Sequence, residues 1–216
     1  ENLDIGVVQG IVGIKQWEVL ITGFANHAGT TPMDQRRDAL YAASQYVQAV
    51  HEIGKKTPGK QVATVGIIKS FPGAPNVIPG IVNASLEIRD LDGKKINSIY
   101  KKIESTSENI AKNTGTKFKF KQTINIIPEP TNRRVSWAIN QAAQDLQLSS
   151  KFMPSGAGHD AQEMAVICPI GMIFIPSKGG ISHSPKEYSS PKDIANGANV
   201  LLHTVLKLDK QYSEEN

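Results

Sequence analysis

The chain has 216 residues, 39% of them hydrophobic and 20% charged, which is typical of a globular protein of one or two domains. No apolar stretch approaches the roughly 18 residues needed to span a bilayer, and the amino-terminal residues lack the features of a signal peptide. The net charge of +4 comes largely from lysines on one predicted helix and one predicted strand, without aromatic residues spaced for base stacking. We therefore expect neither nucleic acid nor a membrane as a partner.

The chain contains a single cysteine, Cys168, so it cannot form an internal disulfide. Such cysteine usage suits a reducing compartment, and we expect a cytoplasmic protein. The apolar segment AVICPIG around Cys168 predicts an inert, buried thiol rather than a nucleophile.

The predicted elements begin with the apolar residues 5–14, which suit a strand. A series of strand, helix, strand, strand, helix and strand follows over residues 17–24, 35–53, 61–71, 81–90, 92–113 and 116–126. Asp34 is the expected cap of the first helix and Gly54 its expected end. Residues 72–80 hold three prolines and two glycines, which predicts a loop without regular structure. This order of elements is that of a ferredoxin-like βαββαβ unit.

After residue 128 the pattern changes to that of an α/β layer. Helices are predicted over residues 132–147 and 191–208, and a third after the glycine turn at 156–158. The wholly apolar segment around residues 170–175 predicts a strand buried in a parallel sheet. The predicted fold is therefore α/β with an inserted α+β unit, in which residues 16–127 interrupt an α/β domain made of 1–15 and 128–216.

Three of the five histidines lie on glycine-rich loops, where ligand-binding side chains are common. His27 lies in NHAGTTP, His159 in SGAGHDAQ and His183 in GGISHSPKE. The structural alternatives are a polar strand-to-helix turn, a helix cap and a solvent-exposed turn, respectively. His51 and His203 lie inside predicted helices without a second ligand nearby, and we interpret them as ordinary helix residues.

The chain has no HExxH motif, no cysteine cluster, no GxSxG motif and no Walker-type phosphate loop. No local motif can therefore assemble a complete zinc site. Two further polar residues are candidates for binding a substrate. Asn76 lies in GAPNVIPG, where it could instead serve only the turn. Arg89 lies near the end of the strand ASLEIRD, where it either pairs with a carboxylate such as Asp90 or binds a substrate anion.

Five segments occur in an order and spacing that resemble one enzyme family: NHAGTTPMDQRRDAL, GAPNVIPG, LEIRD, SGAGHDAQEMA and GGISHSPKE. The sequence resembles the carbamoylase and allantoate amidohydrolase branch of the dinuclear-zinc aminoacylase and carboxypeptidase-type hydrolases. The resemblance implies a catalytic α/β domain, with two divalent metals (zinc, manganese or cobalt), and an inserted ferredoxin-like lid that forms a homodimer. It also implies that this chain matches only the carboxyl-terminal half, so a fragment of this extent is expected to hold no metal tightly and to be inactive alone.

The resemblance assigns roles by position in the motifs. His183 matches the last metal ligand of the family, and the other ligands are expected outside this chain. His27 matches the lid histidine that stabilises the tetrahedral intermediate in the neighbouring subunit. Asn76 and Arg89 match residues that hold the substrate, with Arg89 on its carboxylate, and Gly180 and His159 match positions near the substrate. The expected reaction is cleavage of a ureido or amide C–N bond of a small carboxylate substrate, and the alternative is a non-catalytic dimerisation or small-molecule-binding module.

Overall fold

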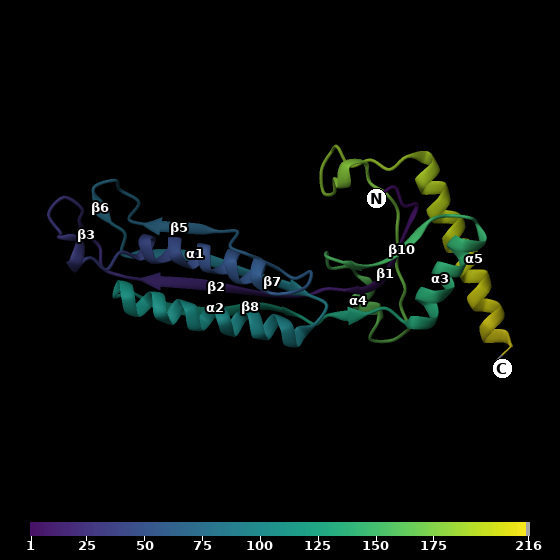
Figure 1. The fold of residues 1–216 in the computed structure, drawn as a ribbon, viewed down its shortest axis with the longest axis horizontal. Helices are drawn as coiled ribbons and strands as arrows, with labels where there is room; N and C mark the ends of the chain where they lie inside the picture. Colours follow the sequence, from purple (N-terminus) through teal and green to yellow (C-terminus); the bar gives the residue numbers. More distant parts are fainter. Residues whose placement is uncertain (215–216) are drawn as a thin grey trace. The chain divides into compact units, whose positions relative to one another are not determined.

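The protein is described by a computed structural model that covers residues 1–214 and falls into two compact units (Figure 1). The first unit combines Glu1–Val12 with the chain from Glu129 onward, and the second is Gly13–Pro128. The sequence placed these boundaries at 15/16 and 127/128. The expected mixed α/β class is confirmed. None of the helices within residues 1–214 combines the length and the apolarity needed to cross a membrane.

The second unit is built on an antiparallel sheet in the order β4-β7-β2-β8, with β5 also paired to β7. The strands are β2 (Gly13–Thr22), β4 (Val62–Thr64), β5 (Ile68–Phe71), β7 (Ile81–Asp90) and β8 (Lys117–Ile126). The predicted strand over residues 61–71 is thus divided into β4 and β5. The ten-residue strands β2 and β7 pair along their whole length, so they form a long, regular centre for the unit.

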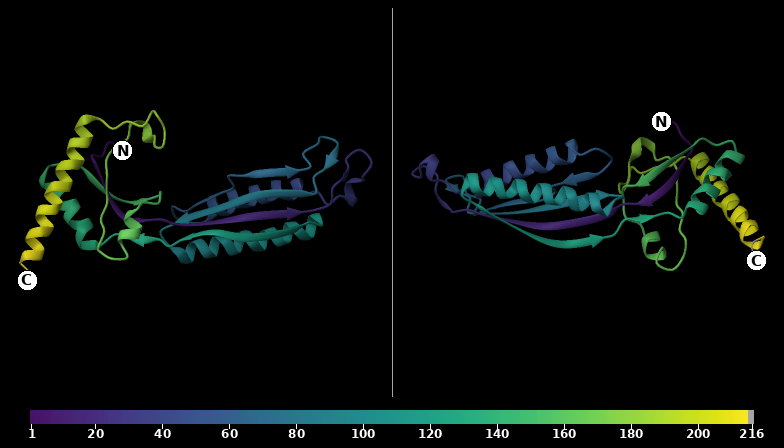
Figure 2. Two further views of the ribbon diagram at one scale, coloured as in Figure 1. Left: turned by 180° about the vertical axis from the view of Figure 1, so that it is seen from behind. Right: turned by 60° about the horizontal axis from the view of Figure 1, so that its bottom comes forward.

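Two helices, α1 (Ala39–Lys56) and α2 (Gly93–Thr114), cover one face of this sheet (Figure 2). Side chains alternate along a strand, so Trp17, Val19 and Ile21 of β2 point to the same face and are buried against the helices. Leu86 and Ile88 do the same on β7. The apolar stripes predicted from helical spacing therefore form one core with the inward residues of the sheet.

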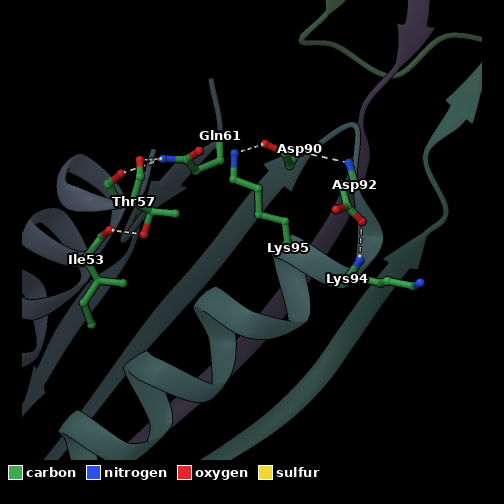
Figure 3. Close-up of polar contacts among 8 residues, drawn as sticks. Ile53, Thr57, Gln61, Asp90, Asp92, Lys94 and Lys95 are labelled. Carbon is green, nitrogen blue, oxygen red and sulfur yellow. Dashed lines mark hydrogen bonds and ion pairs between the residues drawn. The ribbon is translucent and has the colours of Figure 1, made fainter. Parts of the chain in front are cut away.

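The termini of α2 follow local sequence rules. Asp92 caps the helix by accepting a hydrogen bond from the Lys94 amide, and Asp90 forms an ion pair with Lys95 at 3.1 Å (Figure 3). Gly115 ends the helix in the left-handed conformation, with φ of 64°. The predicted helix over residues 92–113 agrees with these bounds to within one residue.

The predicted bounds of α1 are wrong at both ends. Asp38, not Asp34, caps the helix, because the Arg37 carbonyl accepts a hydrogen bond from the Phe24 amide and Arg36 is extended. Asp34 lies instead in the short 3₁₀ turn Met33–Gln35. Gly54 does not end the helix, which continues to Lys56.

The first unit contains a small sheet in the order β10-β1-β11, with β9 also paired to β1. The strands are β1 (Ile5–Ile11), β9 (Glu129–Pro130), β10 (Ser150–Ser155) and β11 (Ile173–Phe174). Strand β10 lies parallel to β1 and was not predicted. The apolar segment at residues 170–175 contributes only β11, which is antiparallel to β1 and half-buried, so the expected buried parallel strand is wrong.

The helices of the first unit are α3 (Arg133–Asp145), α4 (Ala161–Met164) and α5 (Pro191–Ser213). Ile139 of α3 and Val200 of α5 pack with Ile5 and Val7 of β1 in a second core. The helix predicted after the glycine turn is present as α4, but it has only four residues. Cys168 is exposed, so the expected buried thiol is wrong; its neighbours Val166 and Ile167 are exposed as well.

Candidate active site

The loops that carry His27 and Asn76 lie side by side at one end of the second unit. The two-residue strands β3 (Asn26–His27) and β6 (Val77–Ile78) pair beyond the end of β2 (Figure 1). The Ala28 amide also donates to the Asn76 carbonyl at 2.9 Å. This pairing corrects the expectation that residues 72–80 lack regular structure, and it brings two predicted site residues together.

The His27 side chain is exposed, but its orientation is fixed by its own loop. Its Nδ1 accepts a hydrogen bond from the Gly29 amide at 3.0 Å, and its carbonyl accepts one from the Thr31 hydroxyl at 2.7 Å. An amide N–H requires a lone pair on Nδ1, so the neutral imidazole carries its proton on Nε2. The structure therefore presents Nε2 of His27 as a hydrogen-bond donor.

Arg89 lies at the opposite end of the same sheet. It is paired with Ile14 at the start of β2, whereas Thr22, at the end of β2, leads to the His27 loop. Eight residue steps along β2 correspond to about 27 Å at the usual rise of a strand. Within one protomer, Arg89 therefore does not meet His27 and Asn76.

Arg89 pairs with a carboxylate, which was one of its two expected roles, but the partner is not the expected Asp90. Its side chain is 28% exposed and points away from the helix-covered face, because Leu86 and Ile88 alternate with it along β7. Its Nε donates to the Glu87 carboxylate at 2.7 Å, so Glu87 rather than Asp90 is its ion-pair partner. The Arg89 hydrogen bond holds the pKa of Glu87 below its ordinary value, with a smaller contribution from Gln16 and against the opposing effect of burial.

His183 lies on a loop of the first unit whose backbone is unusual. Gly179, Gly180 and His183 have φ values of 69°, 67° and 56°, in the left-handed region that glycine adopts readily and histidine rarely. The His183 amide donates to the Glu187 carboxylate at 2.8 Å, and its Nδ1 lies 2.9 Å from the Ser182 hydroxyl. These contacts fix the His183 backbone and leave Nε2 available for a ligand.

This loop borders an open cavity of about 1020 Å³ within the first unit. Gly180, Ser182 and Glu187 line one side of it. Lys151 and Phe174 contribute a cation and an apolar surface. Lys151 is paired with Glu1 at 2.7 Å, and Asp4, Glu187 and Asp193 also line the cavity, so its charged lining is mainly acidic.

His159 lies on a separate exposed loop before α4. Its Nδ1 accepts a hydrogen bond from the Ala161 amide at 3.0 Å, and its own amide donates to the Gln162 side chain at 3.2 Å. The Asp160 side chain makes no capping hydrogen bond. The imidazole of His159, rather than Asp160, therefore satisfies an amide of the first helical turn.

Two residues that the sequence analysis did not select hold these loops in place. Arg36 binds carbonyl groups of the His27 loop, and Glu187 binds the His183 amide. In the sequence, Arg36 belongs to an arginine pair that follows the segment NHAGTTPMDQ, and Glu187 is a glutamate four positions after His183. Within residues 1–214, no three His, Cys, Asp or Glu side chains gather as a metal-binding group.

Residues 12–207 match the family described as Peptidase family M20/M25/M40. The chain belongs to this family. It is 40% identical over 207 residues to an N-carbamoyl-L-amino acid amidohydrolase of Geobacillus stearothermophilus, covering 96% of this chain and 50% of that protein. It is 41% identical over 210 residues to a ureidoglycolate hydrolase of Arabidopsis thaliana, covering 96% of this chain and 44% of that protein.

Solved structures of family members agree with this membership. A hydantoinase/carbamoylase family amidase from Burkholderia multivorans superposes with a TM-score of 0.90 at 36% identity, covering 95% of this chain and 50% of that one. The expected resemblance to the carbamoylase and allantoate amidohydrolase branch of the M20 family is confirmed. The chain spans about half the length of the curated relatives that it matches.

Proposed function

We propose that this chain is part of a metal-dependent amidohydrolase that cleaves a ureido or amide C–N bond of a small carboxylate substrate. N-carbamoyl amino acids and allantoate are the substrates that we consider first. The observation that carries the proposal is the likeness to amidohydrolases over almost the whole chain, including the loops of His27, Asn76 and His183. Because the chain spans half of these relatives, the activity is proposed for a longer enzyme.

The second unit is proposed to be a ferredoxin-like lid. Its elements follow the βαββαβ order. In the strand order β4-β7-β2-β8, the two central strands are β2 and β7, which are the first and third strands of a βαββαβ unit. This topology leaves the loops after β2 and before β7 together at one end. A lid of this form would present His27 and Asn76 from a rigid base.

In this proposal His27 stabilises the oxygen that gains negative charge when water adds to the substrate carbonyl. A donor fixed before the reaction is effective, because it needs no reorganisation as charge develops. The Nε2–H of His27 is such a donor, since Nδ1 is already engaged by the Gly29 amide. Asn76, on the adjoining loop, is proposed to hold the substrate beside it.

Arg89 is proposed to bind the substrate carboxylate, and this assignment requires two subunits. A small substrate cannot contact both ends of a sheet that are about 27 Å apart. If His27, Asn76 and Arg89 serve one substrate, His27 and Asn76 must come from one protomer and Arg89 from its partner. The separation of the two groups along β2 thus supports a homodimer.

The edge formed by β5 is the better candidate for the dimer contact. Ile67, Ile68 and Phe71 are exposed along it beside one exposed lysine, Lys69. The opposite edge, β8, exposes Ile124 and Ile126 but carries three exposed lysines. Two copies of β8 would bring like charges together across the two-fold axis, which is unfavourable. Ile68→Asp in the longer enzyme is expected to give monomers in sedimentation, with Lys119→Asp as the matched control on the other edge.

The described residues do not by themselves fit a metal site, because only His183 is placed as a ligand and no group of three donors occurs within residues 1–214. We propose that His183 binds through Nε2 and that the remaining ligands of a two-metal site lie outside this chain. Gly180 and His159 are proposed to border the substrate, since Gly180 lines the cavity beside His183 and His159 lies on an exposed loop.

The decisive experiment uses the longer enzyme and measures ammonia release from N-carbamoyl amino acids and allantoate. His27→Ala is expected to lower kcat by about 100-fold or more, as for loss of one oxyanion donor. His51→Ala, on the exposed side of α1, is the control and should leave kcat unchanged. No hydrolysis of any carbamoyl or ureido substrate by the metal-loaded wild type would refute the proposal in favour of the non-catalytic lid-like module.

A further inference from the structure

We infer that Arg36 is a positioning residue that sets the tautomer of His27 through the peptide group between Ala28 and Gly29. The inference rests on the proposed role of His27 in the reaction. Arg36 is half-buried behind the His27 loop, and its side-chain hydrogen bonds all run to carbonyl groups of that loop. No carboxylate within residues 1–214 forms an ion pair with it.

The contacts of Arg36 are directed at two carbonyls. Its Nη2 donates to the Ala28 carbonyl at 2.6 Å and to the Thr31 carbonyl at 3.1 Å, and its Nε donates to the Thr31 carbonyl at 3.1 Å. A guanidinium presents these donors in a rigid plane, so it fixes both carbonyls relative to each other. The segment between them therefore cannot turn without losing charge-assisted hydrogen bonds.

The Ala28 carbonyl and the Gly29 amide belong to the same planar peptide group. Arg36 binds its oxygen, and His27 Nδ1 accepts a hydrogen bond from its N–H at 3.0 Å. Holding the oxygen on Arg36 thus holds the N–H on Nδ1. A cation on the oxygen also polarises the amide, which strengthens its donation to the imidazole.

The opposite orientation of this peptide would have a clear chemical consequence. It would turn the Ala28 carbonyl toward Nδ1, and a carbonyl there favours a proton on Nδ1. The neutral imidazole would then carry a lone pair on Nε2 and could not donate to a developing oxyanion. Gly29 permits the close approach that the present orientation needs, since a Cβ there would lie 3.1 Å from Cε1 of His27.

The tautomer of His27 can be read directly by long-range ¹H–¹⁵N correlation on this chain at a pH where histidine is neutral, with His27→Gln to assign its signals. The wild type is expected to show Nε2–H alone. Arg36→Gln should give a mixture of both tautomers, and Arg36→Lys, which keeps the cation but loses the rigid plane of donors, an intermediate mixture. Arg37→Gln is the matched control, because this neighbouring side chain lies over the Phe24 ring instead.

The same variants are then compared in the longer enzyme. Arg36→Gln is expected to lower kcat by about 10- to 100-fold, with little change in KM, because the donor is lost only where charge develops. Circular dichroism and the Arg36→Lys variant separate this effect from unfolding. The inference is overturned if Arg36→Gln keeps a pure Nε2–H tautomer, or if the tautomer shifts while kcat stays at the Arg37→Gln value. If His27→Ala itself keeps full kcat, the proposed function of His27 fails, whatever the tautomer of the Arg36 variants.

Discussion

The three loop histidines use the same nitrogen for local contacts. Nδ1 of His27 faces the Gly29 amide, Nδ1 of His159 faces the Ala161 amide, and Nδ1 of His183 faces the Ser182 hydroxyl. In each case Nε2 is the nitrogen that remains for a substrate or a metal. The loop context of these histidines was visible in the sequence, but the choice of nitrogen depends on backbone turns that only the structure shows.

The ion pair between Arg89 and Glu87 gives a prediction about acid stability. Arg89→Gln should raise the pKa of Glu87 toward its ordinary value, because Arg89 is the main cause of its lowering. In the wild type, the contribution of this ion pair to the free energy of unfolding is fully present above the ordinary glutamate pKa. It is lost as the pH falls through the lowered pKa of Glu87 in the folded state. The variant is therefore expected to lose about 0.5–1 kcal/mol of unfolding free energy near neutral pH, with less loss at low pH.

Carboxylate NMR titration and urea denaturation at several pH values measure the two effects. Lys121→Gln is the control, since its pair with Glu18 is largely exposed and should contribute nothing measurable. An unchanged Glu87 pKa in Arg89→Gln would contradict the assignment. The substrate role of Arg89 is judged separately by Arg89→Lys in the longer enzyme, which is expected to reduce kcat/KM by the equivalent of about 1.5–3 kcal/mol.

At the scale of elements, sequence rules succeeded where local signals decide and failed where tertiary contacts compete. Helix α2 has a capping aspartate and a terminal glycine that agree with its apolar stripe, and its bounds were predicted. For α1 two aspartates could act as caps, and the hydrogen bond from Phe24 to the Arg37 carbonyl selects the second. Strand β10 was not predicted, because its short sequence shows little alternation of apolar and polar residues. Its assignment as a strand depends on its pairing with β1.

The selection of Asp38 as a cap can be tested. Its carboxylate accepts hydrogen bonds from the Leu40 amide at 2.8 Å and the Tyr41 amide at 3.0 Å. Asp38→Ala leaves both amides without this partner and is expected to lower the unfolding free energy by about 1 kcal/mol in urea denaturation. Asp34→Ala is the matched control, because no side chain caps the 3₁₀ turn that contains it. Equal destabilisation by both substitutions would show that Asp38 does not act as the cap.

At the scale of the whole molecule, the two units keep separate cores. The core of the second unit is made only of residues between Trp17 and Ile110, with partly buried aromatic residues of β8 beside it. The order of its elements was predictable because apolar residues recur with a clear strand or helix period along each of them. The pairing in the first unit was not, since β9 and β11 have two residues each and their positions depend on β1.

Separate cores predict that the second unit folds without the first. The segment 13–128, expressed alone, is expected to unfold cooperatively in urea and to retain the near-ultraviolet signal of Trp17, which stacks on Tyr100 with ring centroids 4.5 Å apart. The chain enters and leaves the unit at adjacent points, because a Cβ on Gly13 would lie 2.5 Å from the Pro128 ring. Loss of the tryptophan signal in the isolated segment would show that its core depends on the rest of the chain.

The last prediction concerns metal binding by the chain as a whole. A single imidazole binds divalent metals weakly, and residues 1–214 contain no cluster of three donors to assist His183. The chain of 216 residues is therefore expected to lose zinc, manganese and cobalt on dialysis, and His183→Ala should not change its metal content. The longer enzyme is expected to retain about two metals per subunit, as two-metal hydrolases do, and to lose metal on His183→Ala. His203→Ala, a substitution within α5, is the control in both proteins. If this chain retains metal stoichiometrically after dialysis, the proposal that the site is shared with residues outside it is contradicted. If His183→Ala leaves the metal content of the longer enzyme unchanged, His183 is not a metal ligand.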